Sequence, residues 1–204
     1  MNIHSVVSAK APKIMTPERG DKREAILDAA LGLFADRGYH GTTMPEVAER
    51  AEVGAGTVYR YFASKEALVN DLFRLWKAQL GAALMSDFPV AAPPRQQFHE
   101  LWRRLCSFAK RHGRALEFLE MHHHGDYLDD ASRAVEKDMM VPLKAFIEEA
   151  QRKEALKAIQ PEILGALVYG GFMALVQAQK KHLLSLSTEV LDDAEQCLWE
   201  AVRR

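Results

Sequence analysis

Apolar residues recur every three or four positions along most of the chain, which is the spacing of one face of an α-helix. Ile26, Ala30 and Leu33 begin the pattern, and a stripe from Val190 to Val202 ends it. No segment alternates apolar and polar residues with the period of two that a half-buried β-strand requires. The spacing therefore predicts an all-α protein.

The overall charge limits how such a protein can bind its partners. The 204 residues are 48% hydrophobic and 27% charged, and the formal net charge is -1. This is the composition of a folded soluble chain that is long enough for one large or two small domains. It lacks the basic excess of a protein that coats nucleic acid. Any surface for DNA or RNA must therefore be a local patch.

Cysteine usage and hydropathy indicate a cytoplasmic protein. Cys106 and Cys197 are far apart and neither belongs to a CxxC unit, so the sequence indicates no disulfide framework and no zinc ribbon. The N-terminus lacks the apolar core of a signal peptide, and no later segment approaches about 18 uninterrupted apolar residues. We expect a cytoplasmic protein that does not enter a membrane.

Breaks in the pattern divide the chain into an arm and two domains. Residues 1–16 mix small, polar and basic side chains without periodicity, which predicts a mobile arm. Residues 17–66 are predicted to form an N-terminal domain, and residues 67–204 a second helical domain. A helix over residues 64–84 links the two, and the pair Pro93-Pro94 follows this linking helix.

Three helix starts lie close together in the N-terminal domain. Thr43 and Glu46 have the spacing of a capping box, with Pro45 in the first turn, where its missing N–H costs nothing. Gly54 precedes a third short helix, and Ser64 is placed as the N-cap of a longer fourth helix. Two short helices joined by a few residues are the layout of a helix-turn-helix.

The third short helix has two different faces. Val58 and Phe62 lie one turn apart and predict its buried side. The opposite side suits a major groove, because an arginine can donate two hydrogen bonds to guanine or phosphate, and hydroxyls can reach bases or phosphates. A merely polar outer face is the alternative interpretation. The candidate DNA contacts are Thr42, Thr43, Ala55, Gly56, Thr57, Tyr59, Arg60, Tyr61 and Lys65, of which Lys65 is assigned to a phosphate.

The run AILDAALGLFADRGYHGTTMPEVAERAEVGAGTVYRYFASKEAL, residues 25–68, resembles the N-terminal domain of the TetR (tetracycline-repressor-like) family of transcriptional regulators. The similarity covers FxxxGY at the end of the first helix, TT before the second, VA within it, and GTVYxYFxSKExL across the third and fourth. It implies a three-helix DNA-binding domain followed by a helical ligand-binding and dimerisation domain. It also implies a dimeric repressor that binds a palindromic operator in double-stranded DNA and is released by a small-molecule effector.

Two positions depart from the family pattern. Glu52 occupies the turn between the second and third helices, where the family usually has glycine. A non-glycine residue in the left-handed region costs roughly 1 to 2 kcal/mol. Gly54 stands where serine or threonine often caps the third helix, a loss of about a few tenths of a kcal/mol. We expect the fold to tolerate both changes.

The last two helices are candidates for the dimer surface, since they would form a four-helix bundle with their symmetry mates. Completion of the monomer core is the alternative role for the same side chains. The candidate interface residues are Gly165, Gly170, Ala174, Leu191, Ala194, Leu198, Trp199 and Val202.

A largely apolar effector site in the second domain would be lined by aromatic, thioether and amide side chains with a few polar anchors. Plain core packing is the more common role of such residues. The candidates are Phe98, Trp102, Phe118, Met121, His122, Tyr127, Met139, Phe146, Tyr169, Phe172, Met173 and Gln177.

The run His122-His123-His124 raises the question of a metal site. Consecutive side chains on a helix point in different directions, whereas a metal requires ligands that converge from one side. We therefore predict no metal and no cofactor. No nucleophile–base pair, phosphate-binding loop or HExxH motif is present, so an enzyme is not expected. A helical metal-dependent enzyme and a scaffold that does not bind DNA remain the rival functions.

Overall fold

A computed structural model describes residues 19–121 and 127–204, and the regular secondary structure in this part of the chain is α-helical, with no strand. The all-α prediction is confirmed. The predicted N-terminal arm lies outside the described residues. The helices are α1 (Arg19–Arg37), α2 (Met44–Arg50), α3 (Ala55–Tyr61), α4 (Lys65–Met85), α5 (Pro94–Arg111), α6 (Gly113–Met121), α7 (Asp130–Arg152), α8 (Pro161–Lys180) and α9 (Thr188–Val202).

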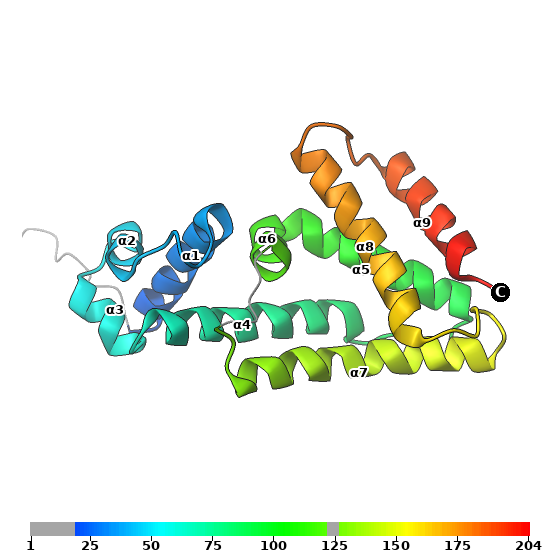
Figure 1. Ribbon diagram of the computed structural model, residues 1–204, viewed down its shortest axis with the longest axis horizontal. Helices are drawn as coiled ribbons and strands as arrows, with labels where there is room; N and C mark the ends of the chain where they lie inside the picture. Colours follow the sequence, from blue (N-terminus) through cyan, green and yellow to red (C-terminus); the bar gives the residue numbers. More distant parts are fainter. Residues whose placement is uncertain (1–18, 122–126) are drawn as a thin grey trace, which may run out of the picture.

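The first three helices form a small bundle at one end of the molecule (Figure 1). Its core is apolar and tightly enclosed, because Ile26, Phe34 and Val58 are all fully buried and Val47 is 1% exposed. Leu68, from the first turn of α4, is also fully buried in this core. The bundle is therefore closed by the beginning of the next helix.

Local signals set the ends of these helices, and the capping box at Thr43 and the cap at Ser64 are those that the sequence predicts. The Thr43 hydroxyl accepts a hydrogen bond from the backbone N–H of Glu46, whose carboxylate accepts from the Thr43 N–H, so the capping box is formed. The Ser64 hydroxyl accepts from the N–H of Ala67 and caps α4. Gly38 has a φ of 71° immediately after α1, which is the left-handed conformation of a helix C-terminus.

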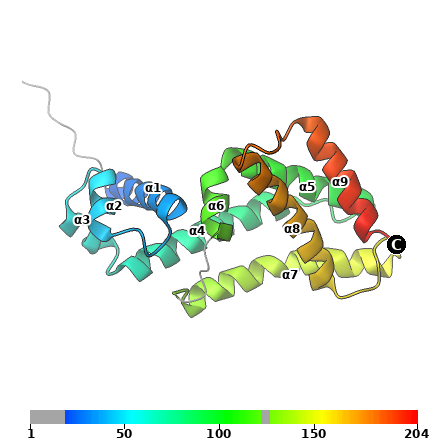
Figure 2. The same ribbon diagram turned by 45° about the horizontal axis from the view of Figure 1, so that its top comes forward.

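Helix α4 extends from the N-terminal bundle into the rest of the molecule (Figures 1 and 2). It packs against α1 at its beginning and against α5, α6 and α7 further along. Its buried apolar residues in this second part are Leu72, Phe73, Leu80 and Leu84, and Lys77 is buried among them. One continuous helix therefore contributes to the cores of both bundles.

The remaining helices build the second bundle, in which α8 and α9 form a hairpin at the end remote from α3 (Figure 1). Phe98, Leu156, Leu164, Trp199 and Val202 make a separate apolar cluster at this end. The cluster joins α5 to the hairpin and fixes where α8 lies.

Helix α8 is unusual in its exposure. It is the one helix in the described residues that is long and apolar enough to cross a membrane, and 11% of its most apolar window is buried. Ile163 and Leu167 are 46% and 52% exposed. Gly170 and Ala174 continue the same outward stripe. One apolar side of α8 is therefore open to solvent in the single chain.

Candidate DNA-contact surface and effector cavity

Helix α3 presents the two faces that its sequence predicts. Val58 is fully buried and Phe62 is 3% exposed, and both belong to the core of the N-terminal bundle. Tyr59 on the opposite side is 51% exposed, and Arg60 beside it is also exposed. The buried pair fixes the rotation of the helix, so the polar side chains face solvent as one surface.

Most of the predicted DNA contacts lie on this exposed surface. Ala55 and Gly56 are exposed at the start of α3, where small residues leave the backbone accessible. Thr57 and Tyr61 are half-buried, and the guanidinium carbon of Arg60 lies 5.4 Å from the centre of the Tyr61 ring. Thr43 is also exposed, at the N-terminus of α2, with its hydroxyl engaged in the capping box.

The turn before α3 holds the two residues that depart from the family pattern. Glu52 adopts a φ of 53°, so the left-handed conformation expected at this position is present. Gly54 is the N-cap of α3 and, having no side chain, makes no side-chain capping bond there. The turn is retained because the backbone N–H of Val53 still donates to the Ala48 carbonyl across it.

Thr42 does not belong to the DNA-contact surface, which corrects its assignment. Its side chain is fully buried, and its hydroxyl donates to the Gly38 carbonyl at 2.9 Å. The residue thereby closes the turn that follows α1. A buried and bonded hydroxyl cannot reach a base or a phosphate.

Lys65 is also better explained as a structural residue than as a phosphate contact. Its ammonium donates to the carbonyls of Tyr39 and Thr42 at 2.9 and 3.0 Å. It also lies 4.1 Å from the centre of the Tyr39 ring. Two of its three N–H donors are therefore used to tie the turn after α1 to the start of α4.

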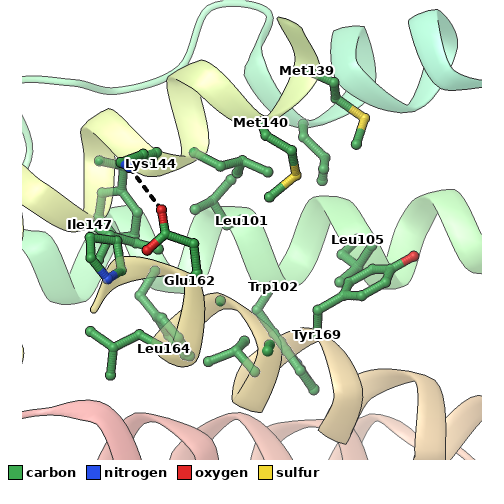
Figure 3. A pocket seen from close by; sticks show the side chains of 18 of the residues that line it. Leu101, Trp102, Leu105, Met139, Met140, Lys144, Ile147, Glu162, Leu164 and Tyr169 are labelled. Carbon is green, nitrogen blue, oxygen red and sulfur yellow. Dashed lines mark hydrogen bonds and ion pairs between the residues drawn. The ribbon is translucent and has the colours of Figure 1, made fainter. Parts of the chain in front are cut away.

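A cavity of about 580 Å³ lies in the second bundle between α4, α5, α7 and α8. Its walls are mainly aliphatic, aromatic and thioether side chains. Figure 3 shows Leu101 and Trp102 of α5, Met139 and Met140 of α7 and Tyr169 of α8 around the same space. A volume of this size fits a drug-sized apolar molecule.

The predicted effector contacts divide into two groups. Phe98, Trp102, Met139, Phe146 and Tyr169 line the cavity. The others in the described residues serve the core: Phe118 stacks on Phe34, Tyr127 stacks on Tyr39, Phe172 meets Trp102 edge to face, and Met173 and Gln177 are half-buried away from the lining. The Met121 side chain and His122 lie outside the residues whose side chains are described.

Polar groups at the cavity form a cluster that the sequence analysis missed. Lys77 is 5% exposed, and its ammonium lies 3.5 Å from a carboxylate oxygen of Glu120 and 3.2 Å from one of Glu136. A signal was available in the sequence, because Lys77 falls in register with Phe73, Leu80 and other buried residues of α4. At the rim, the Lys144 ammonium donates to Glu162 at 2.7 Å.

Tyr169 brings a second polar feature to the cavity. Its hydroxyl is buried and, among the described residues, has no hydrogen-bond partner. Burial is the main cause that raises its pKa, and the negative charge of Glu120 nearby adds to the effect. The phenol therefore stays protonated.

The predicted dimer residues also occupy different environments. Gly170 and Ala174 are exposed on α8, and no atom lies within 4 Å of the position that a side chain at Gly170 would take. Gly165 faces the cavity instead. Leu191, Ala194 and Leu198 are half-buried between α9 and the core.

Trp199 and Val202 are corrections to the predicted dimer surface. They are 9% and 1% exposed in the single chain, and both pack in the cluster that contains Phe98. The ring centres of Phe98 and Trp199 are 5.2 Å apart. The alternative role, completion of the monomer core, is the one that these two residues have.

A buried polar network joins α4 to the start of α7. The Asn70 side-chain amide donates to the carbonyls of Glu66 and Tyr127, both at 2.8 Å. Its oxygen accepts from the Asp129 N–H at 2.9 Å and from the Ser132 hydroxyl at 2.8 Å. The network therefore holds the segment before α7 against the part of α4 nearest the N-terminal bundle.

Comparisons with known proteins agree with this architecture. Residues 26–72 match the family described as bacterial regulatory proteins, tetR family, and residues 73–204 match the tetracyclin repressor-like C-terminal domain. The HTH-type transcriptional regulator YhgD of Bacillus subtilis is 26% identical over 173 residues, which are 84% of this chain and 91% of the relative.

Two further relatives extend the comparison. The HTH-type transcriptional repressor KstR2 of Mycobacterium tuberculosis is 29% identical over 136 residues, which are 65% of this chain and 60% of KstR2. A TetR-family transcriptional regulator of known structure from Haemophilus influenzae has a TM-score of 0.75 at 23% identity, over 93% of this chain and all of the other.

The matched families together span residues 26–204 without a gap. The helix-turn-helix, the helical second bundle and the shared α4 are the parts that such regulators require. The chain belongs to the TetR family of transcriptional regulators.

Proposed function

We propose that this protein is a dimeric repressor that binds a palindromic operator through α3 and is released by a small molecule in the cavity. The observation that carries the proposal is the exposed surface of α3, held outward by the burial of Val58 and Phe62. An exposed helix of this kind in the second position of a helix-turn-helix enters the major groove. We place the protein in the cytoplasm, where it has access to DNA.

Arg60 and Tyr59 are the side chains that we assign to the operator. Arg60→Ala and Tyr59→Ala should each weaken operator binding, by about 1 to 3 kcal/mol for a bidentate arginine contact to guanine. The matched control is Arg152→Ala, because Arg152 is exposed at the far end of α7. Fluorescence anisotropy with the DNA upstream of the protein's own gene, at fixed salt, measures the effect. Unchanged affinity in both variants contradicts the assignment.

Dimerisation is proposed to use the outward stripe of α8, formed by Ile163, Leu167, Gly170 and Ala174. These residues are spaced about one helical turn apart, so they form a continuous apolar strip. Such a strip can pack against the same strip of a second copy related by a two-fold axis. An exposed apolar stripe on a soluble regulator is stabilised by burial against a partner. The soluble character of the family makes a second copy the occupant, rather than a lipid bilayer.

The interface is tested by changing its most exposed leucine. Leu167→Glu places a charge in the stripe and should give monomers in light scattering at micromolar concentration. Val90→Glu is the control, because Val90 is 72% exposed on the loop between α4 and α5 and is not part of the stripe on α8. A dimer mass for Leu167→Glu would place the interface elsewhere. Leu198, which lies against Gly171 within the chain, is less suitable for the test.

Release by the effector is proposed to act through α4. This helix contributes Lys77, Leu80 and Leu84 to the cavity, and its first turn holds the turn after α1 through Lys65. A ligand that prefers one position of α4 therefore changes the separation of the two α3 helices. Only a ligand whose affinity differs between the two positions of α4 produces this shift. Moving the ratio of the two conformations from about 1:99 to 99:1 requires a difference in binding free energy of about 5.5 kcal/mol.

A further inference from the structure

The charges at the cavity are unbalanced. Among the described lining residues, Lys77 and Lys144 carry positive charge, whereas Glu120, Glu136 and Glu162 carry negative charge. Lys144 and Glu162 pair with each other at the rim. Lys77 is left between two carboxylates, so the inner cluster has an excess of one negative charge.

The position of Lys77 places this excess negative charge beside the cavity. The lysine is nearly fully buried and is shared, at 3.5 and 3.2 Å, between two carboxylates on different helices. Glu120 is the more enclosed of the two carboxylates, at 21% exposed, whereas Glu136 is 46% exposed and partly solvated. One ammonium cannot neutralise both, and the unbalanced charge is most costly at the enclosed carboxylate. Asp138 borders a smaller adjoining pocket that also reaches Lys77, which adds a further negative group on this side.

The other polar and aromatic groups of the cavity are also matched to a positive ligand. The Tyr169 hydroxyl oxygen offers a lone pair, and so a partial negative charge, to a cation, since no described residue donates to it. Trp102, Phe98 and Phe146 add aromatic rings to the walls. Aromatic faces attract cations, and a cation–π contact contributes more to binding when it is shielded from water.

The geometry points to a lipophilic organic cation as the effector: an apolar molecule that carries one ammonium or phosphonium centre, seated between Glu120, Glu136 and Tyr169. This inference rests on the proposed function, whose effector cavity it describes. The cation competes with Lys77 for the two carboxylates. Lys77 lies on α4, so the competition changes the contacts of the helix that joins the cavity to the DNA-binding bundle.

A matched pair of probes isolates the sign of the charge. Tetraphenylphosphonium and tetraphenylborate have nearly the same size and shape but opposite charge. Titration calorimetry of the full-length protein without DNA should show tetraphenylphosphonium binding at least about tenfold more tightly than tetraphenylborate. A flexible benzyldimethylalkylammonium ion, used below its micelle concentration, serves as a second cation of different shape.

Variants test whether the named carboxylates produce the preference. Glu120→Gln and Glu136→Gln keep the side-chain shape and should each weaken tetraphenylphosphonium binding by about three- to tenfold. Glu189→Gln is the matched control, because Glu189 is exposed on α9. Lys77→Met removes the competing positive charge and should strengthen cation binding, which is the opposite of what general damage to the fold would cause.

The outcomes decide the proposal in either direction. Equal or tighter binding of tetraphenylborate, binding of neither cation, or cation affinities unchanged in both glutamine variants would overturn it. DNA binding is measured separately with the unliganded protein. A protein that binds its operator but prefers the anion refutes the cation inference alone, whereas one that binds the cation through Glu120 and Glu136 but no DNA refutes the proposed function alone.

Discussion

Asn70 is a single side chain on which the junction between the two bundles depends. It is 3% exposed, and both its amide and its oxygen have two partners each. The partners lie on α4, on the segment before α7 and on α7 itself. A side chain that bonds several buried polar groups contributes more to the free energy of unfolding than its buried area alone, because its loss leaves each partner without a hydrogen bond.

The Asn70→Ala change should therefore lower the free energy of unfolding by about 2 to 4 kcal/mol. Urea unfolding followed by circular dichroism measures it. Ser132→Ala is the graded control, since it removes one of the Asn70 bonds, together with the bond that the Ser132 hydroxyl accepts from Arg74, and should cost about 1 kcal/mol. A loss below that of Ser132→Ala would show that the network does not hold the junction.

Glu100 orients an arginine that binds the turn between α4 and α5. Its carboxylate accepts hydrogen bonds from Arg103 and Arg104, and Arg104 in turn donates to the Leu84 and Ser86 carbonyls at 3.0 and 2.6 Å. The Arg103 hydrogen bond is the largest cause that lowers the pKa of Glu100, from 4.5 to about 2, and the Arg104 bond adds to it.

This depressed pKa gives a stability that depends on pH. The folded pKa lies below the unfolded one, so the contribution is complete above about pH 4.5 and is lost as the pH falls towards 2. After allowance for solvent screening, Glu100→Gln should cost about 1 kcal/mol at pH 7, with the difference from the wild type fading below pH 4.5. Urea unfolding at several pH values measures this difference, and a constant difference from pH 7 to pH 3 would contradict it.

At the scale of elements, the first turn of α4 also binds the turn that follows α1. The Tyr39 hydroxyl donates to the Glu66 carboxylate, Lys65 donates to two carbonyls of the preceding turn, and the Tyr39 ring stacks on Tyr127 with centres 4.2 Å apart. Burial raises the pKa of Tyr39, and the hydrogen bond to the Glu66 carboxylate raises it further. The turn after α1 therefore moves with α4.

A structural role for Lys65 predicts a different outcome from a phosphate contact. Lys65→Met should lower the melting temperature by a few degrees, about 1 kcal/mol, because two carbonyls lose a charged donor. It should leave the salt dependence of operator binding unchanged, whereas loss of a phosphate contact reduces the slope by about one. A wild-type melting temperature together with a reduced slope would restore the phosphate assignment.

At the scale of the whole molecule, the proposed operator surface lies at one end of the long axis, and α8, which lines the cavity and carries the proposed dimer stripe, lies towards the other end (Figure 1). Helix α3 lies at one end and the α8–α9 hairpin at the other, and α4 spans the distance between α3 and the cavity. The two proposed binding events therefore share one helix, and a ligand whose affinity differs between two positions of α4 couples them.

Thermodynamic linkage makes this relation measurable. If a ligand in the cavity weakens operator binding by some factor, the operator must weaken binding of that ligand by the same factor. Titrating tetraphenylphosphonium into the free protein and into the protein saturated with operator should give two dissociation constants in that ratio. Equal constants, alongside operator release by the same ion, would mean that the release does not occur through this cavity.

Much of the N-terminal bundle was predictable because its signals are local. A capping box at Thr43, an N-cap at Ser64 and two apolar residues one turn apart on α3 each act within a few residues. The same signals could not show that Thr42 points inward while Thr43 points outward. That difference depends on which carbonyl of the preceding turn lies within reach.

The sequence by itself determined that this chain is helical, where its helix-turn-helix lies and which side of α3 faces inward. Only the tertiary structure decided which apolar side chains line the cavity and which fill the core, and that Trp199 and Val202 close the monomer. It also decided that Lys77 meets Glu120 and Glu136. Helical periodicity fixes the face on which a residue lies, whereas its neighbour on that face comes from another helix, whose position depends on the packing of the whole chain.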